Sequence, residues 1–368
     1  MKIEQIEMRL IKLPLLHPFE TSFGVDTDRT MILVTIHSQG EEGWAESVMD
    51  PLPYYREETI EGAWHLILDG FIPFILGKDI QNPQSLIDLL AQFRGNQQAK
   101  AVVEMAFWDL WARSLHMPLY QFLGGTRQAI PVGVSLGIQK SIAETIELIH
   151  QHVSEGYKRI KLKIKPTWDL ELISHVRQEF PKITLTVDAN SAYSLADLPV
   201  FREMDSFALD YIEQPLAYDD IVDHARLQSR LVTPLCLDES ILSASDARKA
   251  LEMDACRVIN IKVARVGGIR SAQQVHDLAA AFCVPVWCGG MLESGIGRAF
   301  NIHLATLPNF SKPGDTSSSS RYWSQDIINE PLEAKNGMMP VPEGPGTGVS
   351  INLPFINHLT LKHERIKK

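Results

Sequence analysis

The sequence predicts an α/β protein in which a barrel of alternating strands and helices follows a smaller region of mixed structure. The chain has 368 residues, which is too long for one ordinary hydrophobic core, and one barrel takes about 200–250 residues. After Gly124-Gly125, short β-rich runs alternate with helical stretches of about 10–15 residues, the pattern of βα units around a parallel sheet. Before that glycine pair, strands come first and helices afterwards.

The region before the glycine pair begins with a β-meander. Residues 1–50 are rich in β-forming side chains, and Gly40–Gly43 is expected to turn the chain before a strand at Trp44–Val48. The spacing of apolar residues then becomes helical. The expected helices run from Arg56 to about Leu76, over Pro83–Phe93 and over Ala99–Leu115. Residues 101–112 are interpreted as core without chemistry of their own.

Seven β-rich runs follow the glycine pair. Strands are expected at Val132–Ile138, Arg159–Ile164, Ile183–Val187, Ala208–Ile212, Pro234–Leu237, Arg257–Ile261 and Val284–Trp287. Ser141 and Glu144 form a capping-box pattern at the start of the first helix between them. The run Lys312–Thr316 is the candidate for an eighth strand, and no further βα unit follows about Ile327. This number of units indicates a barrel and not an open sheet.

Composition excludes several classes of function. The formal net charge is −10, so the basic surface of a nucleic-acid-binding protein is missing. No apolar run approaches the roughly 20 residues of a membrane span, and the N-terminus has the pattern of a strand and not of a signal peptide. The four cysteines form no CxxC pair, which favours reduced thiols in a cytoplasmic protein. We expect no nucleic-acid or membrane partner, and a homo-oligomer.

Charged residues lie at the C-terminal ends of five consecutive expected strands. Alternate strand residues point into a barrel, and barrel active sites lie at these strand ends. The inward-facing charged residues at these ends are Lys163 (with Lys161 on the same face), Asp188, Glu213, Asp238 and Lys262. From Lys163 onward they are 24 or 25 residues apart, about the length of one βα unit. Three carboxylates should therefore converge, with a lysine on each side.

The charged residues at the strand ends are more informative together than any one of them alone. A single Asp after a strand is usually the N-cap of the next helix, and a single lysine is usually solvated. Three carboxylates buried together are unfavourable unless something neutralises them. Three oxygen ligands with open positions suit Mg²⁺ or Mn²⁺. We therefore predict that Asp188, Glu213 and Asp238 bind Mg²⁺ (or Mn²⁺).

The motifs around these residues resemble those of the enolase superfamily, muconate-lactonizing subgroup. They are Lys161-Leu-Lys163, Asp188-Ala-Asn190, Glu213-Gln-Pro215, Asp238-Glu-Ser240 and Asn260-Ile-Lys262. Three further segments resemble the o-succinylbenzoate synthase / N-acylamino acid racemase family: residues 18–24, 289–295 and 314–323. The resemblance covers essentially the whole chain.

The resemblance implies a (β/α)7β TIM-like barrel with an α+β capping domain. The capping domain would comprise residues 1–125, the barrel residues 126–326, and residues 327–368 would return to the cap. The loop at 18–24 would cover the substrate, a small-molecule carboxylate. Sites of this superfamily pair a lysine or histidine base with Mg²⁺, which stabilises the charge that develops when a proton next to a carboxylate is removed.

The resemblance also implies a role for each residue. Lys163 would take the α-proton of 2-succinyl-6-hydroxy-2,4-cyclohexadiene-1-carboxylate, a step of menaquinone synthesis, and help its hydroxyl leave as water, while Lys262 stabilises the developing charge. In racemisation of N-acylamino acids the two lysines would act in turn. Supporting roles are expected for Lys161, Asn190, Glu239 and Arg265, and Arg265 favours racemisation. Substrate contacts are expected from Phe19, Phe23, Ser135, Gly290 and Met291.

Several alternatives remain open. The main activity could be racemisation of N-succinylamino acids or other N-acylamino acids, and a dipeptide epimerase or a cycloisomerase has the same core motifs. Residues 133–137 match the G-x-S-x-G elbow of serine hydrolases, but that motif requires a sharp turn from strand to helix, and here the strand pattern continues to Ile138. A non-catalytic binding protein would not need all five charged positions. Residues 344–348 resemble a phosphate loop, but no βαβ unit follows them.

Overall fold

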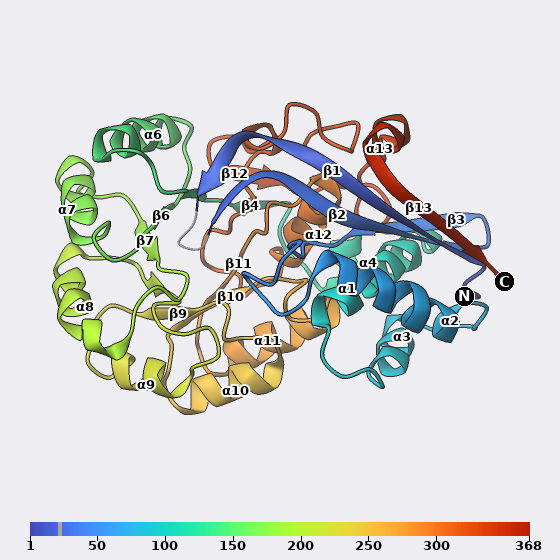
Figure 1. Cartoon of the computed structure of the whole chain (residues 1–368), viewed down its shortest axis with the longest axis horizontal. Helices are drawn as coiled ribbons and strands as arrows, with labels where there is room; N and C mark the ends of the chain where they lie inside the picture. Colours follow the sequence, from blue (N-terminus) through green and yellow to red (C-terminus); the bar gives the residue numbers. More distant parts are fainter. Residues whose placement is uncertain (21–23) are drawn as a thin grey trace.

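Two sheets organise the chain (Figure 1). In the computed structural model, which describes residues 1–20 and 24–368, one sheet has four strands in the order β13-β1-β2-β3 and the other has seven in the order β11-β10-β9-β8-β7-β6-β5. The four-stranded sheet is antiparallel and the seven-stranded sheet is parallel. The predicted fold class, an α/β barrel with a separate α+β cap, is confirmed.

The antiparallel sheet joins the two ends of the chain. Its strands are β1 (Gln5–Glu20), β2 (Val25–Ser38), β3 (Glu41–Glu46) and β13 (Thr360–Lys367). Gln5 pairs with Lys367, which places the two termini together at the far end of this sheet (Figure 1). The C-terminal segment therefore returns to the N-terminal sheet; the exact domain boundaries stay a prediction.

The expected turn at Gly40–Gly43 is shorter than predicted, because β3 already begins at Glu41. Gly43 lies inside this strand, where the backbone of a helix approaches it closely. A Cβ atom at Gly43 would lie 2.2 Å from the carbonyl oxygen of Ala106. The glycine is therefore required by close packing of strand against helix and not by a turn.

The helices of the cap lie close to the predicted ranges. They are α1 (Ile60–His65), a π-helix (Leu66–Phe71), α2 (Ile72–Ile75), α3 (Pro83–Leu90), α4 (Gln97–Ser114) and α5 (Leu119–Leu123). The first expected helix begins at Ile60 and not at Arg56, with Thr59 as its N-cap. Helix α4 packs against β3, as expected of a core helix. It also carries a buried carboxylate, Glu104, which accepts hydrogen bonds from the backbone N–H groups of Ile269 and Arg270.

Each of the seven expected barrel runs overlaps one strand of the parallel sheet. These are β5 (Val134–Leu136), β6 (Ile160–Lys163), β7 (Leu185–Asp188), β8 (Ile212–Glu213), β9 (Leu235–Leu237), β10 (Val258–Ile261) and β11 (Val286–Cys288). The largest difference is at the fourth run, which was expected to begin at Ala208. That residue has a left-handed backbone conformation, φ 50°, so the preceding turn extends further than the side chains suggested.

Helices cover the outside of the parallel sheet, and all but the last of them form an outer arc in Figure 1. They are α6 (Ile142–Ser154), α7 (Leu170–Glu179), α8 (Leu198–Met204), α9 (Val222–Gln228), α10 (Ala244–Glu252), α11 (Ile269–Ala281) and α12 (Gly295–Leu304). The side chain of Ser141 caps α6 by accepting from the N–H of Glu144, as predicted. Short elements complete the chain: β4 (Ala129–Pro131), β12 (Met338–Pro340) and α13 (Leu353–Leu359).

The predicted eighth strand at Lys312–Thr316 is not a regular strand in the described structure. Single parallel bridges instead connect Phe310 to Val286 and Gly314 to Val132. They close the gap between β11 and the start of β5. Pro313 lies between the bridged residues and has no N–H group, so it cannot donate to a continuous ladder.

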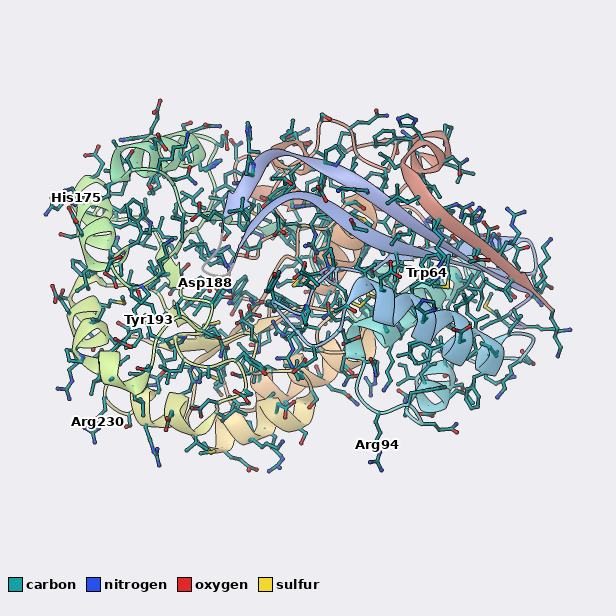
Figure 2. All side chains as sticks on the ribbon, in the orientation of Figure 1. Trp64, Arg94, His175, Asp188, Tyr193 and Arg230 are labelled. Carbon is teal, nitrogen blue, oxygen red and sulfur yellow. The ribbon has the colours of Figure 1, made fainter. Side chains whose placement is uncertain are left out.

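Figure 2 shows Asp188 in the interior of the barrel, whereas Arg94, His175 and Arg230 project from the surface. Among the described residues, no helix is both long enough and apolar enough to cross a membrane.

Candidate active site

The parallel register brings the predicted residues to one edge of the barrel. Lys163 pairs with Asp188 in the sheet, and Asp188 pairs with Glu213. Asp238 follows β9 and Lys262 follows β10, so the strand ends present their side chains side by side. All five side chains are buried, with exposed fractions between 0 and 8%. The structure thus brings together the two lysines and the three carboxylates; their roles stay predictions.

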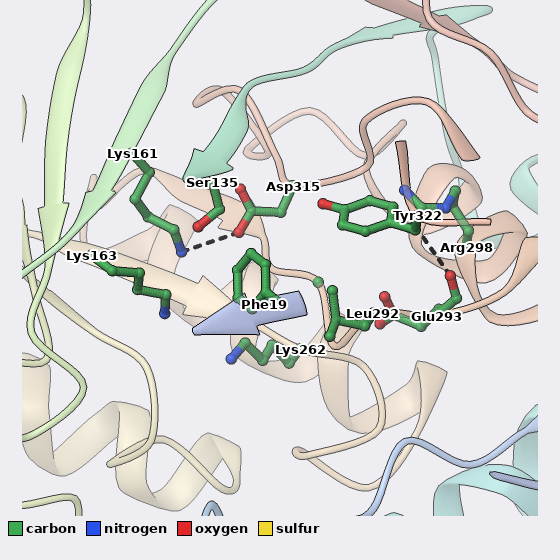
Figure 3. A pocket seen from close by; sticks show the side chains of 11 residues that line it. Phe19, Ser135, Lys161, Lys163, Lys262, Leu292, Glu293, Arg298, Asp315 and Tyr322 are labelled. Atoms are coloured by element: carbon green, nitrogen blue, oxygen red, sulfur yellow. Dashed lines mark hydrogen bonds and ion pairs between the residues drawn. The ribbon is translucent and has the colours of Figure 1, made fainter. Parts of the chain in front are cut away.

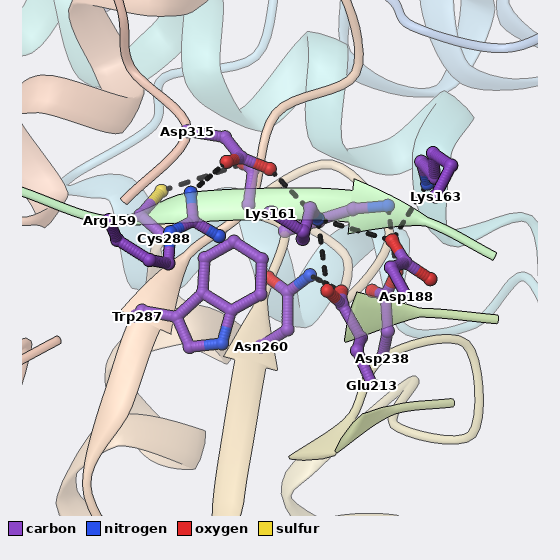
Figure 4. A network of polar contacts seen from close by, with 12 residues as sticks. Arg159, Lys161, Lys163, Asp188, Glu213, Asp238, Asn260, Trp287, Cys288 and Asp315 are labelled. Atoms are coloured by element: carbon purple, nitrogen blue, oxygen red, sulfur yellow. Dashed lines mark hydrogen bonds and ion pairs between the residues drawn. The ribbon is translucent and has the colours of Figure 1, made fainter. Parts of the chain in front are cut away.

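Lys163 and Lys161 lie on β6 and both contact Asp188 (Figure 4). Lys163 Nζ donates to Asp188 Oδ2 at 2.7 Å and to Asn190 Oδ1 at 2.5 Å. Lys161 Nζ lies 2.9 Å from Glu213 Oε2 and 3.2 Å from Asp188 Oδ2. Lys161 therefore bridges two of the predicted metal ligands.

Lys262 occupies the opposite side of the site. Its Nζ lies 2.9 Å from Asp238 Oδ2 and donates to the Tyr55 hydroxyl at 3.0 Å. Arg265 contacts the other oxygen of Asp238 and donates to the same Tyr55 hydroxyl at 3.1 Å. Its guanidinium also donates to the carbonyl oxygens of Ile241 and Asn260. Arg265 is thus fixed beside Lys262 by four separate partners.

One predicted supporting residue, Asn190, links the lysines and carboxylates. Asn190 accepts from Lys163 and donates through Nδ2 to Glu239 Oε1 at 2.9 Å. Its backbone N–H also donates to Asp188 Oδ1 at 3.1 Å. Asn190 therefore contacts both Lys163 and Asp188 and connects them to Glu239; its supporting role stays a prediction.

The sequence reasoning missed several members of this network. Tyr55 comes from the segment before α1, where no sequence pattern pointed to it. Asp315 lies 3.1 Å from Lys161 and contacts Arg159; it lies in the segment 314–323 that carried the resemblance, so that segment was the available signal. The ring of Trp287 lies under Lys161, with its centroid 4.7 Å from Nζ. Asn260, by contrast, belongs to a motif quoted from the sequence, Asn260-Ile-Lys262; it donates to Glu213 Oε1 at 2.8 Å.

Burial and charge perturb the pKa values of these groups in opposite directions. Burial alone would raise the pKa of Asp188, but Lys163 and Lys161 outweigh it and hold that pKa far below its usual range. Burial and repulsion from Asp188 raise the pKa of Glu213. Burial would lower the pKa of Lys262, but its contact with Tyr55 and the charges of Glu239 and Glu213 raise it. These contacts favour the ammonium form of Lys262.

The three carboxylates fit a divalent cation in chemical kind, although they now face lysine and arginine. Among the described residues, no group of three His, Cys, Asp or Glu side chains is arranged as a ready metal site. Asp188, Glu213 and Asp238 nevertheless provide three carboxylates at adjacent strand ends, the donor set that Mg²⁺ and Mn²⁺ prefer. Their present counter-charges are Lys161, Lys163, Lys262 and Arg265. A bound cation would replace some of these contacts.

A cavity of about 60 Å³ lies against the lysines (Figure 3). Three of the predicted substrate contacts, Phe19, Ser135 and Gly290, line it together with Lys161, Lys163 and Lys262. Met291 does not line it; the neighbouring Leu292 does, because its left-handed backbone (φ 56°) turns the chain there. Phe23 lies outside the described residues.

Ser135 is not placed as the nucleophile of a serine hydrolase. It lies within β5 and pairs with Lys161 of β6, so it is part of a regular strand and not of a sharp turn into a helix. Its hydroxyl is buried and has no hydrogen-bond partner among the described residues. It is therefore available to a bound ligand.

Two family models match the chain. The model described as "Enolase C-terminal domain-like" matches residues 144–355, and the "Mandelate racemase / muconate lactonizing enzyme, N-terminal domain" model matches residues 5–124. The chain belongs to this family of the enolase superfamily. The predicted resemblance is therefore confirmed over both parts of the chain.

Relatives that are 41–58% identical to the chain carry two different names. The chain is 58% identical to an N-succinylamino acid racemase of Thermus thermophilus, over 98% of each chain. It is 49% identical to an o-succinylbenzoate synthase of Geobacillus kaustophilus, over 97% of this chain and 96% of that one. A solved structure of an enolase-superfamily protein from Listeria innocua has a TM-score of 0.97 and 39% identity, covering 100% of this chain and 99% of that one.

Proposed function

We propose that this enzyme removes the proton next to a carboxylate, and that it does so as an o-succinylbenzoate synthase that also racemises N-succinylamino acids. The observation that carries this proposal is the pair of buried lysines, Lys163 and Lys262, on opposite sides of three carboxylates and beside one cavity. Both reactions begin with the same proton removal. The substrate of the synthase would be 2-succinyl-6-hydroxy-2,4-cyclohexadiene-1-carboxylate.

Lys163 is the proposed base for dehydration. It must lose its own proton before it accepts that of the substrate, and it would then return that proton to the departing hydroxyl. Asn190 holds Nζ from one side at 2.5 Å, which limits the positions the amine can take. Lys262, as an ammonium, would stabilise the negative charge that develops on the substrate.

Asp188, Glu213 and Asp238 would hold Mg²⁺. When bound, the ion would supply positive charge beside the substrate carboxylate, where negative charge accumulates. The formal charges of the site support the need for a divalent cation. Among the described residues the network contains five carboxylates and five cationic side chains, so their formal charges balance. The cations are Arg159, Lys161, Lys163, Lys262 and Arg265. The carboxylates are Asp188, Glu213, Asp238, Glu239 and Asp315.

Catalysis disturbs this balance in a defined way. One lysine must become neutral to act as a base, and the substrate adds a carboxylate. Two negative charges are then in excess, and a single divalent cation restores neutrality in a site too buried for water to do so. The proposed metal is thus the counter-charge that the reaction itself requires.

Racemisation is the second proposed activity, with Lys163 and Lys262 acting in turn from the two faces of the substrate. Two observations favour it: the lysines flank the carboxylates from opposite sides, and the racemase of Thermus thermophilus is 58% identical. The same residues serve both reactions because the first step is shared. The substrate decides between dehydration and racemisation, since only the synthase substrate carries a hydroxyl that can leave.

The first test measures dehydration as the loss of diene absorbance. The rate is measured with Mg²⁺ and then with EDTA. Fast turnover that EDTA abolishes would support the synthase. Racemisation would be followed by optical rotation of an N-succinylamino acid and by exchange of its α-proton in D₂O. Absence of both reactions with metal present would refute the proposed function. Cytoplasmic location and homo-oligomeric assembly stay predictions from the sequence.

A further inference from the structure

The small cavity beside the lysines adjoins a larger one. A groove of about 790 Å³ runs between the end of β1, the segment after β5 and helix α6. The cavity and the groove share three lining residues, Phe19, Ser135 and Tyr322. These three therefore mark the junction through which one end of a substrate can extend away from the lysines.

Two guanidinium groups flank Tyr322 at this junction. Arg298 lies over its ring at 5.0 Å from the centroid, and Arg321 at 5.3 Å. Neither forms an ion pair with a carboxylate of the described residues, whereas Arg159 and Arg265 in the catalytic network each do. The two guanidinium groups at the junction therefore have no paired carboxylate among the described residues, which favours an anionic ligand.

Arg321 is the group placed to contact such a ligand. Arg298 is 2% exposed and donates to the carbonyl oxygens of Ser317 and Glu293, so its charge acts from behind the ring. Arg321 lines the groove, and only its Nη1 has hydrogen-bond partners among the described residues: Ser317 Oγ at 2.9 Å and the Tyr322 hydroxyl at 3.4 Å. The rest of its donors remain for a ligand.

The nearby polar groups match this assignment. The Ser135 hydroxyl, which lines both spaces, is buried without a hydrogen-bond partner among the described residues. Three carboxylates line the groove, Glu20, Glu144 and Glu155. Glu20 lies 3.6 Å from Lys165 Nζ and Glu144 accepts from the backbone N–H of Lys140, whereas the charge of Arg321 acts on Glu155 from a distance. That carboxylate already accepts from Gln151 at 2.9 Å and bonds His152 at 2.8 Å. It is therefore not the missing partner of Arg321.

We propose that Arg321, together with the Tyr322 hydroxyl, binds the second carboxylate of a dicarboxylate substrate and so selects succinyl groups over uncharged acyl groups. This inference rests on the proposed function, whose two substrates both carry a succinyl arm. The first carboxylate stays at the lysines, and the arm passes Ser135 into the groove. A guanidinium binds a carboxylate through charge-assisted hydrogen bonds, which a methyl group cannot replace.

The experiment compares two substrates in the Mg²⁺-loaded enzyme. N-succinyl-L-methionine and N-butyryl-L-methionine share a four-carbon acyl skeleton, and only the first ends in a carboxylate. The variant Arg321→Met should lower kcat/KM for the succinyl substrate by about 10- to 100-fold, mainly through KM, and that for the butyryl substrate by less than about 3-fold. Arg321→Lys, which retains the charge, should recover much of the preference. Tyr322→Phe should lower kcat/KM for the succinyl substrate only, and by a smaller factor than Arg321→Met.

Controls separate this inference from the proposed function and from folding. Arg230→Met, which removes an exposed arginine at the far surface (Figure 2), should change neither value. An equal loss on both substrates in Arg321→Met would show a structural role and overturn the proposal, as would unchanged values on both. If the wild-type enzyme turns over neither substrate and also fails in dehydration, the proposed function itself has failed. Thermal unfolding of each variant checks that the fold is retained.

Discussion

Arg265 is placed to control the basicity of Lys262. Both side chains donate to the Tyr55 hydroxyl, and both contact Asp238. Arg265 is 1% exposed, so water screens little of the repulsion between the two cations. Replacing Arg265 with methionine therefore stabilises the ammonium form of Lys262 and makes the neutral amine rarer. The proposed racemisation needs that amine, whereas the proposed dehydration needs only the positive charge.

The structure gives the magnitude of this effect. The two nitrogens lie 3.0 and 3.1 Å from the same oxygen, so they are no more than about 6 Å apart. At that separation and an effective dielectric constant of about 20, two unit charges repel by about 3 kcal/mol. Loss of this repulsion corresponds to a roughly 100-fold shift of Lys262 toward the ammonium.

The assay follows three rates in Arg265→Met with saturating Mg²⁺: dehydration, and α-proton exchange in D₂O from each enantiomer of an N-succinylamino acid. Exchange from the enantiomer that faces Lys262 should fall by about 100-fold, and the other two rates by less than about 10-fold. Arg265→Lys is the control, because it keeps the charge while losing the planar donors. Equal losses in all three rates of Arg265→Met would refute the electrostatic reasoning and indicate a general distortion of the site.

Three further predictions follow from contacts of the catalytic network and of Glu104. Lys163→Ala should abolish dehydration. Lys262→Ala should abolish inversion of configuration, while α-proton exchange continues from the enantiomer that faces Lys163. D₂O exchange with chiral analysis measures this, and retained inversion would contradict the two-base scheme. EDTA should remove activity and lower Tm, and added Mg²⁺ should restore both, since a ligand that binds only the folded state stabilises it; a Tm that ignores EDTA would argue against the metal site. Burial raises the pKa of Glu104 from 4.5 to about 7, so its protonated form stabilises the fold at low pH and this stabilisation is lost as pH rises toward 7. Relative to Glu104→Gln, the wild-type free energy of unfolding in urea should therefore fall by about 3 kcal/mol between pH 4 and 8, and parallel pH profiles would contradict this.

The barrel and its charged edge were predictable from sequence for a simple geometric reason. Parallel strands end at the same edge, and side chains alternate between inside and outside. A spacing of 24 or 25 residues therefore places Asp188 beside Glu213 without knowledge of any loop. The register of the sheet then brings Lys163 beside Asp188. Periodicity was sufficient because these contacts depend only on the backbone of regular elements.

The remaining parts of the site depend on chain paths that periodicity does not describe. Tyr55 reaches Lys262 from a segment before α1, more than 200 positions earlier in the sequence. The segment with Asp315 closes the barrel through isolated bridges, since Pro313 interrupts its hydrogen bonding. Gly43 looked like a turn residue, because a pattern in one strand cannot show how closely α4 approaches it. In each case the deciding contact joins distant segments.

The arrangement also explains how one site can serve two reactions under the proposed function. Lys163 ends β6 and Lys262 follows β10, and the sheet order places the strands of the three carboxylates between them. A substrate held over the carboxylates therefore meets an amine or ammonium at each side. Which reaction predominates then depends on the protonation of Lys262, which Arg265 would set. On this reasoning, relatives can exchange main activities while both lysines and all three carboxylates stay unchanged.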